Sequence, residues 1–220
     1  MQGKPEKPDK TDKADKPDKK EQKRELILDT AFELILEKGY SNTKIIDIAN
    51  KVGIGKGTVY EYFESKEMIA LELINTRASR DYTMICEEVN MLTTAKEQLS
   101  RYVELQLETF TKFKMNITDF RNEFLRNDSE ISLKIIEAIH GIAFLQLGFI
   151  YNIIEKGIAN GEFKALDPHS ASICFLGSIN AYLGLSHYDD ELNQTELFKD
   201  FNFDKNEDTF LDCIFKGLLA

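Results

Sequence analysis

The side chains best suited to contact another molecule are hydroxyl and ammonium donors gathered between Thr43 and Lys66. Within this segment, Lys56 and Thr58 flank Gly57, a glycine that would let the backbone come close to a binding partner. A lysine can donate to guanine O6 and N7, and a threonine methyl group can contact the methyl group of thymine. Lys56 could instead pair with a phosphate. These residue types favour contact with double-stranded DNA.

Two short apolar patterns surround these donors. Four apolar residues recur at the spacing of one helix face and predict a helix over 43–52: Ile45, Ile48, Ala49 and Val52. Gly53 follows, where a helix end favours a residue that tolerates a positive φ. Gly55 is an acceptable N-cap for a second helix over 56–63. Helix, glycine turn and second helix form the helix-turn-helix plan, in which the start of the second helix enters the DNA major groove.

The order and spacing of many residues in this region are typical of one family. They are Ala31, Phe32, Gly39, Tyr40, Thr43, Ile48, Ala49, Val52, Gly53, Lys56, Gly57, Thr58, Val59, Tyr60, Tyr62, Phe63 and Lys66. Through them, the segment from Lys23 to Leu73 resembles the DNA-binding region of TetR/AcrR-type transcriptional repressors. The resemblance implies an all-α chain with a three-helix helix-turn-helix head and a C-terminal helical bundle for ligand binding and dimerisation.

The resemblance also implies roles for single residues. Four of them are expected to donate to DNA phosphates: Thr43, Tyr60, Tyr62 and Lys66. Lys44 could reach a base or a phosphate. Gly55 stands where the family often has a small hydroxyl residue, so only its backbone N–H is left as a donor. Two alternatives stay open, namely that Tyr60 and Tyr62 are core aromatics and that Lys66 is an ordinary surface lysine.

The rest of the chain also has the periodicity of helices. Apolar spacing predicts helices over 21–38, 66–88, 96–113, 119–125, 131–159, 169–185 and 207–219, and no alternating strand pattern occurs. Ser65 is the expected N-cap of the helix that links head and body. We therefore divide the chain into a charged tail (1–20), a helix-turn-helix DNA-binding domain (21–66) and a helical ligand-binding and dimerisation domain (67–220).

The charge distribution limits where DNA could bind. The net charge of −10 argues against nucleic-acid binding by the whole surface. Binding through a small face should involve few phosphates and weaken quickly with salt. The lysine-rich tail has too few apolar residues to fold, so we expect disorder. It is either a solvated leader or a weak electrostatic arm over DNA.

The sequence gives no sign of an enzyme, and we expect no cofactor and no metal site. His140, His169 and His187 lack metal-ligand spacing, and no nucleotide-binding glycine motif occurs. The three cysteines are far apart and are expected to be free thiols: Cys86, Cys174 and Cys213. We expect no membrane span, because no apolar run approaches the required ~18 residues, and no apolar stretch follows the N-terminus as in a signal peptide. Both features favour a cytoplasmic protein.

Two very apolar helices, over 141–159 and 171–185, exceed what one bundle needs for its inner face. By resemblance they form a four-helix dimer interface with a second copy, although they could simply be central to the monomer core. A helix-turn-helix reader also needs two heads about one DNA turn apart. We therefore expect a homodimer on a palindromic operator.

Aromatic residues are frequent in the body and could line a ligand cavity, although phenylalanine is also ordinary core filler. The candidates are Phe110, Phe113, Phe120, Phe124, Phe144, Tyr151 and Phe175. The sequence thus predicts a homodimeric repressor that a small apolar or amphipathic ligand releases from DNA. The alternative is a helical dimeric protein-interaction module with weak or no DNA binding.

Overall fold

The computed structural model describes residues 19–113, 117–126, 129–186, 188–199 and 201–219, and the description excludes the side chains of 110–113, 117–120, 189–190 and 204. Nearly all of the predicted charged tail lies outside the described residues. Within these ranges the chain is helical, as predicted, apart from turns, short connections and one isolated bridge between Phe163 and Leu219.

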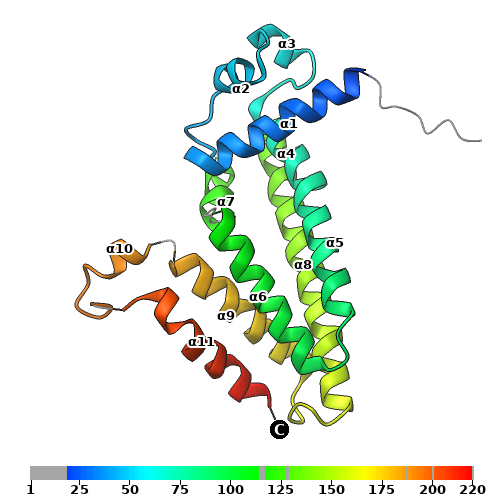
Figure 1. The fold of residues 1–220 in the computed structure, drawn as a ribbon, viewed down its shortest axis with the longest axis vertical. Coiled ribbons are helices and arrows are strands. Elements are labelled where there is room, and N and C mark those ends of the chain that lie inside the picture. Colours follow the sequence, from blue (N-terminus) through cyan, green and yellow to red (C-terminus); the bar gives the residue numbers. More distant parts are fainter. Residues whose placement is uncertain (1–18, 114–116, 127–128, 187, 200, 220) are drawn as a thin grey trace, which may run out of the picture.

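The helices form a small head above a long body (Figure 1). The head comprises α1 (Lys19–Lys38), α2 (Ile45–Val52) and α3 (Lys56–Tyr60). A connecting helix runs from the head into the body as α4 (Lys66–Leu73), the π-helical turn η1 (Ile74–Ala78) and α5 (Ser79–Asn90). The body continues with α6 (Ala95–Phe113), α7 (Ile117–Leu125), α8 (Glu130–Ala159), α9 (Pro168–Ser186), α10 (Asp189–Leu192) and α11 (Phe203–Leu218).

The head has its own apolar core, in which α1 packs across the two shorter helices. All three contribute fully buried side chains, and α4 adds one more: Ile27, Leu28 and Ala31 of α1, Ile48 and Ala49 of α2, Val59 of α3 and Ile69 of α4. The second helix of the motif ends at Tyr60 and not at the predicted Phe63. After Tyr60 the backbone tightens, because the N–H of Tyr62 donates to the carbonyl of Val59 at 3.0 Å. This turn brings Phe63 into the core.

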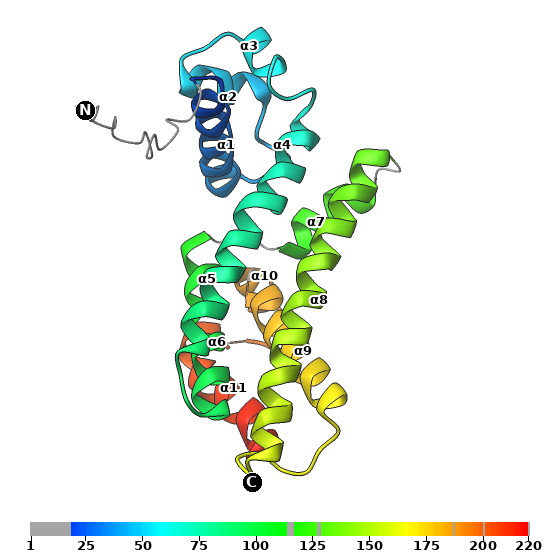
Figure 2. The same cartoon turned by 90° about the vertical axis from the view of Figure 1, so that its right-hand side faces the viewer.

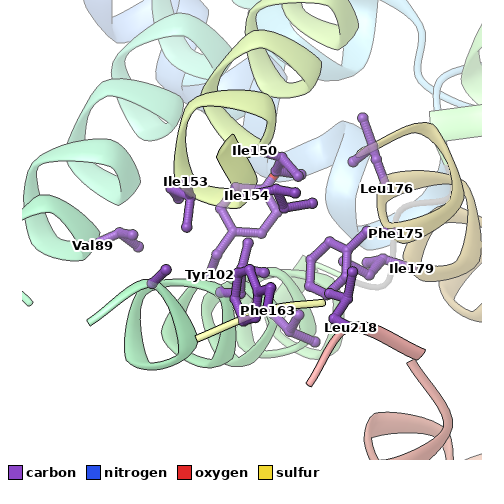
Figure 3. Packing of buried hydrophobic residues seen from close by; sticks show 13 residues of the cluster. Val89, Tyr102, Ile150, Ile153, Ile154, Phe163, Phe175, Leu176, Ile179 and Leu218 are labelled. Carbon is purple, nitrogen blue, oxygen red and sulfur yellow. The ribbon is translucent and has the colours of Figure 1, made fainter. Parts of the chain in front are cut away.

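A second core lies at the lower end of the body, where α5, α6, α8, α9 and α11 meet (Figure 3). Tyr102 of α6 is fully buried at its centre, and its hydroxyl accepts a hydrogen bond from Gln106 at 2.8 Å. Phe163, in the α8–α9 connection, fills the space beside Gly157. A Cβ added to Gly157 would lie 2.3 Å from the Phe163 ring, so this close packing requires glycine.

A third apolar cluster joins the head to the body. Tyr40 from the head packs on Phe124 of α7 with ring centroids 4.9 Å apart. Ala70 and Ile74 of the connecting helix and Ile135 of α8 complete the contact. Burial, and secondarily the charges of nearby Glu67 and Glu123, raises the pKa of the Tyr40 phenol well above its usual range. The head therefore rests on a packed joint.

Helix α8 is more apolar than its packing requires. By length and composition it is the one helix in the described part of the chain that could cross a membrane, which corrects the expectation that no apolar run is long enough. Only 11% of that apolar window is buried within the protomer. One long side of α8 faces away from α5 and α6 (Figure 2), and Phe144 on α8 is 72% exposed.

Candidate nucleic-acid interface

The turn between α2 and α3 is built on the two predicted glycines. Gly53 has φ 78°, a left-handed conformation that glycine adopts without strain. The following N–H, of Ile54, donates back to the carbonyl of Ala49 at 3.0 Å and closes the end of α2. Gly55 is extended at φ −72° and ψ 147°, and its carbonyl accepts from the N–H of Thr58 at 3.0 Å. The chain therefore starts α3 at Lys56, as predicted.

The start of α3 lies at the outer end of the head (Figures 1 and 2). Gly55, Lys56 and Gly57 are exposed, and Thr58 is half-buried. Tyr60 is 45% exposed, so it is not the core aromatic that the sequence left open. The Lys56 ammonium lies 5.6 Å from the centroid of the Tyr60 ring, which holds the lysine over an aromatic face.

Four lysines of the head differ in whether a carboxylate lies within salt-bridge distance. Lys38 pairs with Asp47 at 2.5 Å, and Lys51 lies 3.2 Å from both Glu33 and Glu37. Hydrogen bonds to Glu37 and Glu33 raise the pKa of Lys51. In contrast, Lys44 and Lys56 have no carboxylate at salt-bridge distance among the described residues, and both side chains are exposed. Two of the predicted DNA-contacting lysines are therefore available for phosphates or bases.

Thr43 lies inside the head, although the resemblance implies that it donates to a phosphate. The residue is fully buried, and its hydroxyl donates to the carbonyl of Gly39 at 2.8 Å. Its backbone N–H donates to the carbonyl of Tyr40 at 3.1 Å. In this structure Thr43 therefore holds together the turn that leads from α1 to α2.

Lys66 also has partners within the protein. Its ammonium donates to the carbonyl of Tyr40 at 2.9 Å and lies 3.9 Å from the centroid of the Tyr40 ring. Burial lowers the pKa of Lys66, partly opposed by the charges of Glu67 and Glu123. In this conformation Lys66 belongs to the contact between head and body and is not a plain surface lysine. Tyr62 is half-buried against the head core.

Arg24 is a residue of this region that the sequence reasoning missed. Its guanidinium lies 4.8 Å from the centroid of the Phe63 ring and also pairs with Glu72 of α4. Arg24 thus contacts the end of the recognition segment from α1. No local pattern in the sequence indicates this contact, because Arg24 and Phe63 are far apart along the chain.

Four of the seven predicted ligand-pocket aromatics lie in different surroundings. Phe144 is exposed on α8, and the Tyr151 hydroxyl donates to Glu155 at 2.8 Å. Phe175 packs against Phe215 in the lower core, and Phe124 packs against Tyr40 between head and body. The side chains of the other three candidates lie outside the described residues: Phe110, Phe113 and Phe120.

Comparison with known proteins agrees with this architecture. Residues 27–73 match the family described as "Bacterial regulatory proteins, tetR family", and residues 85–216 match "QacR-like protein, C-terminal region". The fatty acid metabolism regulator protein of Bacillus subtilis is 28% identical over 155 residues, which are 70% of this chain and 78% of that protein. The regulator QacR of Staphylococcus aureus is 26% identical over 181 residues, 81% of this chain and 92% of QacR.

Solved structures show the same fold. FadR from Bacillus subtilis, in complex with stearoyl-CoA, has a TM-score of 0.66 at 24% identity and is matched over 88% of this chain and 98% of FadR. A putative transcriptional regulator from Saccharomonospora viridis, in complex with choline, has a TM-score of 0.76 at 24% identity, over 91% and 99% of the two chains. The chain therefore belongs to the TetR family, with a QacR-like C-terminal region, and is a DNA-binding transcriptional regulator in a family whose members are not enzymes.

Proposed function

We propose that this regulator is a homodimeric repressor that binds a palindromic operator and leaves it when a small apolar or amphipathic molecule binds the body. The observation that carries the DNA-binding part is a pair of exposed lysines in the head, Lys44 and Lys56, whose ammonium groups have no carboxylate at salt-bridge distance in the described part of the chain. Gly55 and Gly57 beside Lys56 leave room for the phosphate backbone to approach. We assign base contact to Lys56 and Thr58, and phosphate contact to Lys44, Tyr60 and Tyr62.

The unburied side of α8 supports the homodimer. Phe144 on α8 and Ile173 on α9 are 72% and 59% exposed, which is costly for large apolar side chains in water. Glycines on the same helices, Gly148 and Gly177, have open space around them and allow close approach of another helix. A second copy covering this face would bury the apolar window of α8 and fix two heads relative to each other. We place the dimer in the cytoplasm.

The ligand class rests on the family. FadR is described in complex with stearoyl-CoA and the Saccharomonospora regulator in complex with choline, so related folds hold amphipathic or cationic molecules. For release from DNA, the ligand must bind the DNA-free conformation more tightly than the DNA-bound one. A preference of about 100-fold corresponds to about 2.7 kcal/mol of coupling.

A gel-shift with the DNA flanking the protein's own gene tests the proposal. Excess nonspecific DNA is present, and the wild-type protein should give a specific shift that weakens steeply with salt. Lys56→Ala should lose the shift. Lys199→Ala, which removes an exposed lysine of the body, is the matched control and should bind normally.

Two results would count against the proposal. Equal binding by wild type and Lys56→Ala would remove Lys56 from the interface. If a folded, dimeric protein also selected no sequence from a random DNA pool, the protein-interaction alternative would take precedence.

A further inference from the structure

The connecting helix changes its winding where it leaves the head. Residues Ile74–Ala78 form a π-helical turn between α4 and α5. Such wide turns are rare, and they commonly lie at functional sites. The hydroxyl of Thr76 donates to the carbonyl of Glu72 at 2.7 Å, which supplies that carbonyl with a donor at the widened turn. The turn must be held by its surroundings, because an ordinary α-helix is the favoured alternative.

Helix α1 forms ion pairs with the connecting helix at two positions, one just before this turn and one within it. Arg24 of α1 pairs with Glu72, which lies just before the turn. In the second pair the arginine is on the connecting helix: Arg77, within the turn, pairs with Asp29 of α1, and its guanidinium lies 3.2 Å from the Glu25 carboxylate. We call these five residues the arginine clamp.

Each half of the arginine clamp has one partner that is largely shielded from solvent. The side chains of Glu72 and Arg77 are 17% and 18% exposed, whereas those of Arg24, Glu25 and Asp29 are 31%, 49% and 52% exposed. Solvent therefore screens the charges of Glu72 and Arg77 less than those of their partners. Both arginines are planar donors that lose less freedom per hydrogen bond than lysines. The partners come from separate elements, so the clamp fixes α1 against the connecting helix and does not merely reinforce one helix.

The arginine clamp also reaches the DNA-reading segment. The Arg24 guanidinium lies 4.8 Å from the centroid of Phe63, which is buried just after α3. Any rotation of the connecting helix at η1 would therefore be transmitted through α1 and Phe63 to the position of α3.

We propose that Arg24 and Arg77 are positioning residues that hold the π-helical turn and so set the angle of the head on the body. Neither arginine needs to touch DNA. In the dimer, this angle decides the distance between the two copies of α3, and hence which half-site spacing the protein accepts. The inference rests on the proposed function, since it concerns how two heads fit one operator.

The test uses the full chain and a palindromic site recovered from a random DNA pool. Fluorescence anisotropy measures binding to that site, to probes with one to three base pairs added or removed between the half-sites, and to a single half-site. Wild type should favour one spacing. Arg77→Ala should bind that spacing about tenfold more weakly, a loss of the size expected when the charge-assisted hydrogen bonds of one arginine are removed. It should also discriminate less between spacings and bind the single half-site within about twofold of wild type.

Control variants separate positioning from general damage. Arg101→Ala is matched, because Arg101 contacts three glutamates within the body and is not in contact with the head. It should retain the wild-type spacing profile. Asp29→Ala combined with Arg77→Ala should cost little more than Arg77→Ala alone, since both substitutions remove the same pair.

Hydrogen–deuterium exchange provides a readout that needs no DNA. Arg77→Ala should accelerate exchange in residues 74–78, whereas Arg101→Ala should not. An unchanged spacing profile in Arg77→Ala, or a parallel loss on the half-site and the palindrome, would overturn the inference. If wild type binds no DNA, the proposed function fails. The exchange data then decide whether the arginine clamp holds the turn.

Discussion

At the scale of single residues, Thr43 shows how a polar side chain in the head can act through the fold. Its hydroxyl is buried and donates to the carbonyl of Gly39. Thr43→Val keeps the shape but leaves that acceptor without its donor, so the free energy of unfolding should fall by about 1–3 kcal/mol. Urea denaturation measures the change.

Two variants complete this prediction. Thr43→Ser retains the hydroxyl and should lose less stability than Thr43→Val. Thr83→Val removes an exposed hydroxyl that donates to the carbonyl of Ser79 at 2.9 Å, and should cost under about 0.5 kcal/mol. An unchanged unfolding midpoint for Thr43→Val, together with weaker DNA binding, would contradict this structural role and favour direct contact of Thr43 with DNA.

The candidate site could be predicted from the sequence as far as position along the helices decides it. The start of α3 at Lys56 follows from Gly53 and Gly55, and its exposure follows from the apolar spacing of the opposite face. The hydrogen-bond partners of Thr43 and Lys66, the carbonyls of Gly39 and Tyr40, could not be predicted, because they depend on how the turn after α1 folds back. The contact of Arg24 with Phe63 depends on tertiary packing alone.

At the scale of elements, the periodic helices were predicted within a few residues of their observed bounds, because each buries one apolar face. Ser65 caps α4 as predicted, accepting from the N–H of Met68 at 3.2 Å. The π-helical turn had no local sequence signal; we attribute it to the pairing of Arg77 with Asp29 of α1, a contact between residues far apart along the chain. The shorter α3 likewise follows from the burial of Phe63.

The contact between α8 and the connection to α9 gives a prediction at this scale. Gly157→Ala places a methyl group 2.3 Å from the Phe163 ring and 2.8 Å from Cβ of Ala95, both in the lower core. The clash should cost about 1–3 kcal/mol despite the better helix propensity of alanine. Gly217→Ala on α11 meets no atom within 4 Å and should be neutral or slightly stabilising. Thermal unfolding of both variants measures the difference in stability. Equal melting temperatures would show that the Phe163 ring moves aside without cost, contrary to the prediction.

At the scale of the whole molecule, two cysteines can report whether α8 and α9 face a second copy. Cys174 on α9 and Cys213 on α11 are both exposed in the protomer. In the proposed dimer, iodoacetamide should modify Cys213 quickly and Cys174 slowly. Dilution to monomer should equalise the two rates. Cys86 should react slowly in both states, because burial raises the pKa of its thiol. Equal rates for Cys174 and Cys213 in a sample that is dimeric by light scattering would place the interface elsewhere.

Because the chain has an acidic net charge of −10, we expect tight DNA binding to depend on the proposed dimer. One head offers few unpaired cations, so a single half-site should be held weakly, while two linked heads raise the effective concentration of the second. Phe144→Asp puts a charge on the exposed face of α8 and should yield monomers by sedimentation. Its affinity for the palindrome should then fall by about 100-fold, to the level of half-site binding.

Leu197→Asp is the control for Phe144→Asp. It alters an even more exposed apolar residue outside α8 and α9, so both the dimer and its affinity for the palindrome should be unchanged. A monomeric Phe144→Asp that still binds the palindrome tightly would mean that each head binds DNA by itself, and the geometry of the dimer would then have no part in recognition.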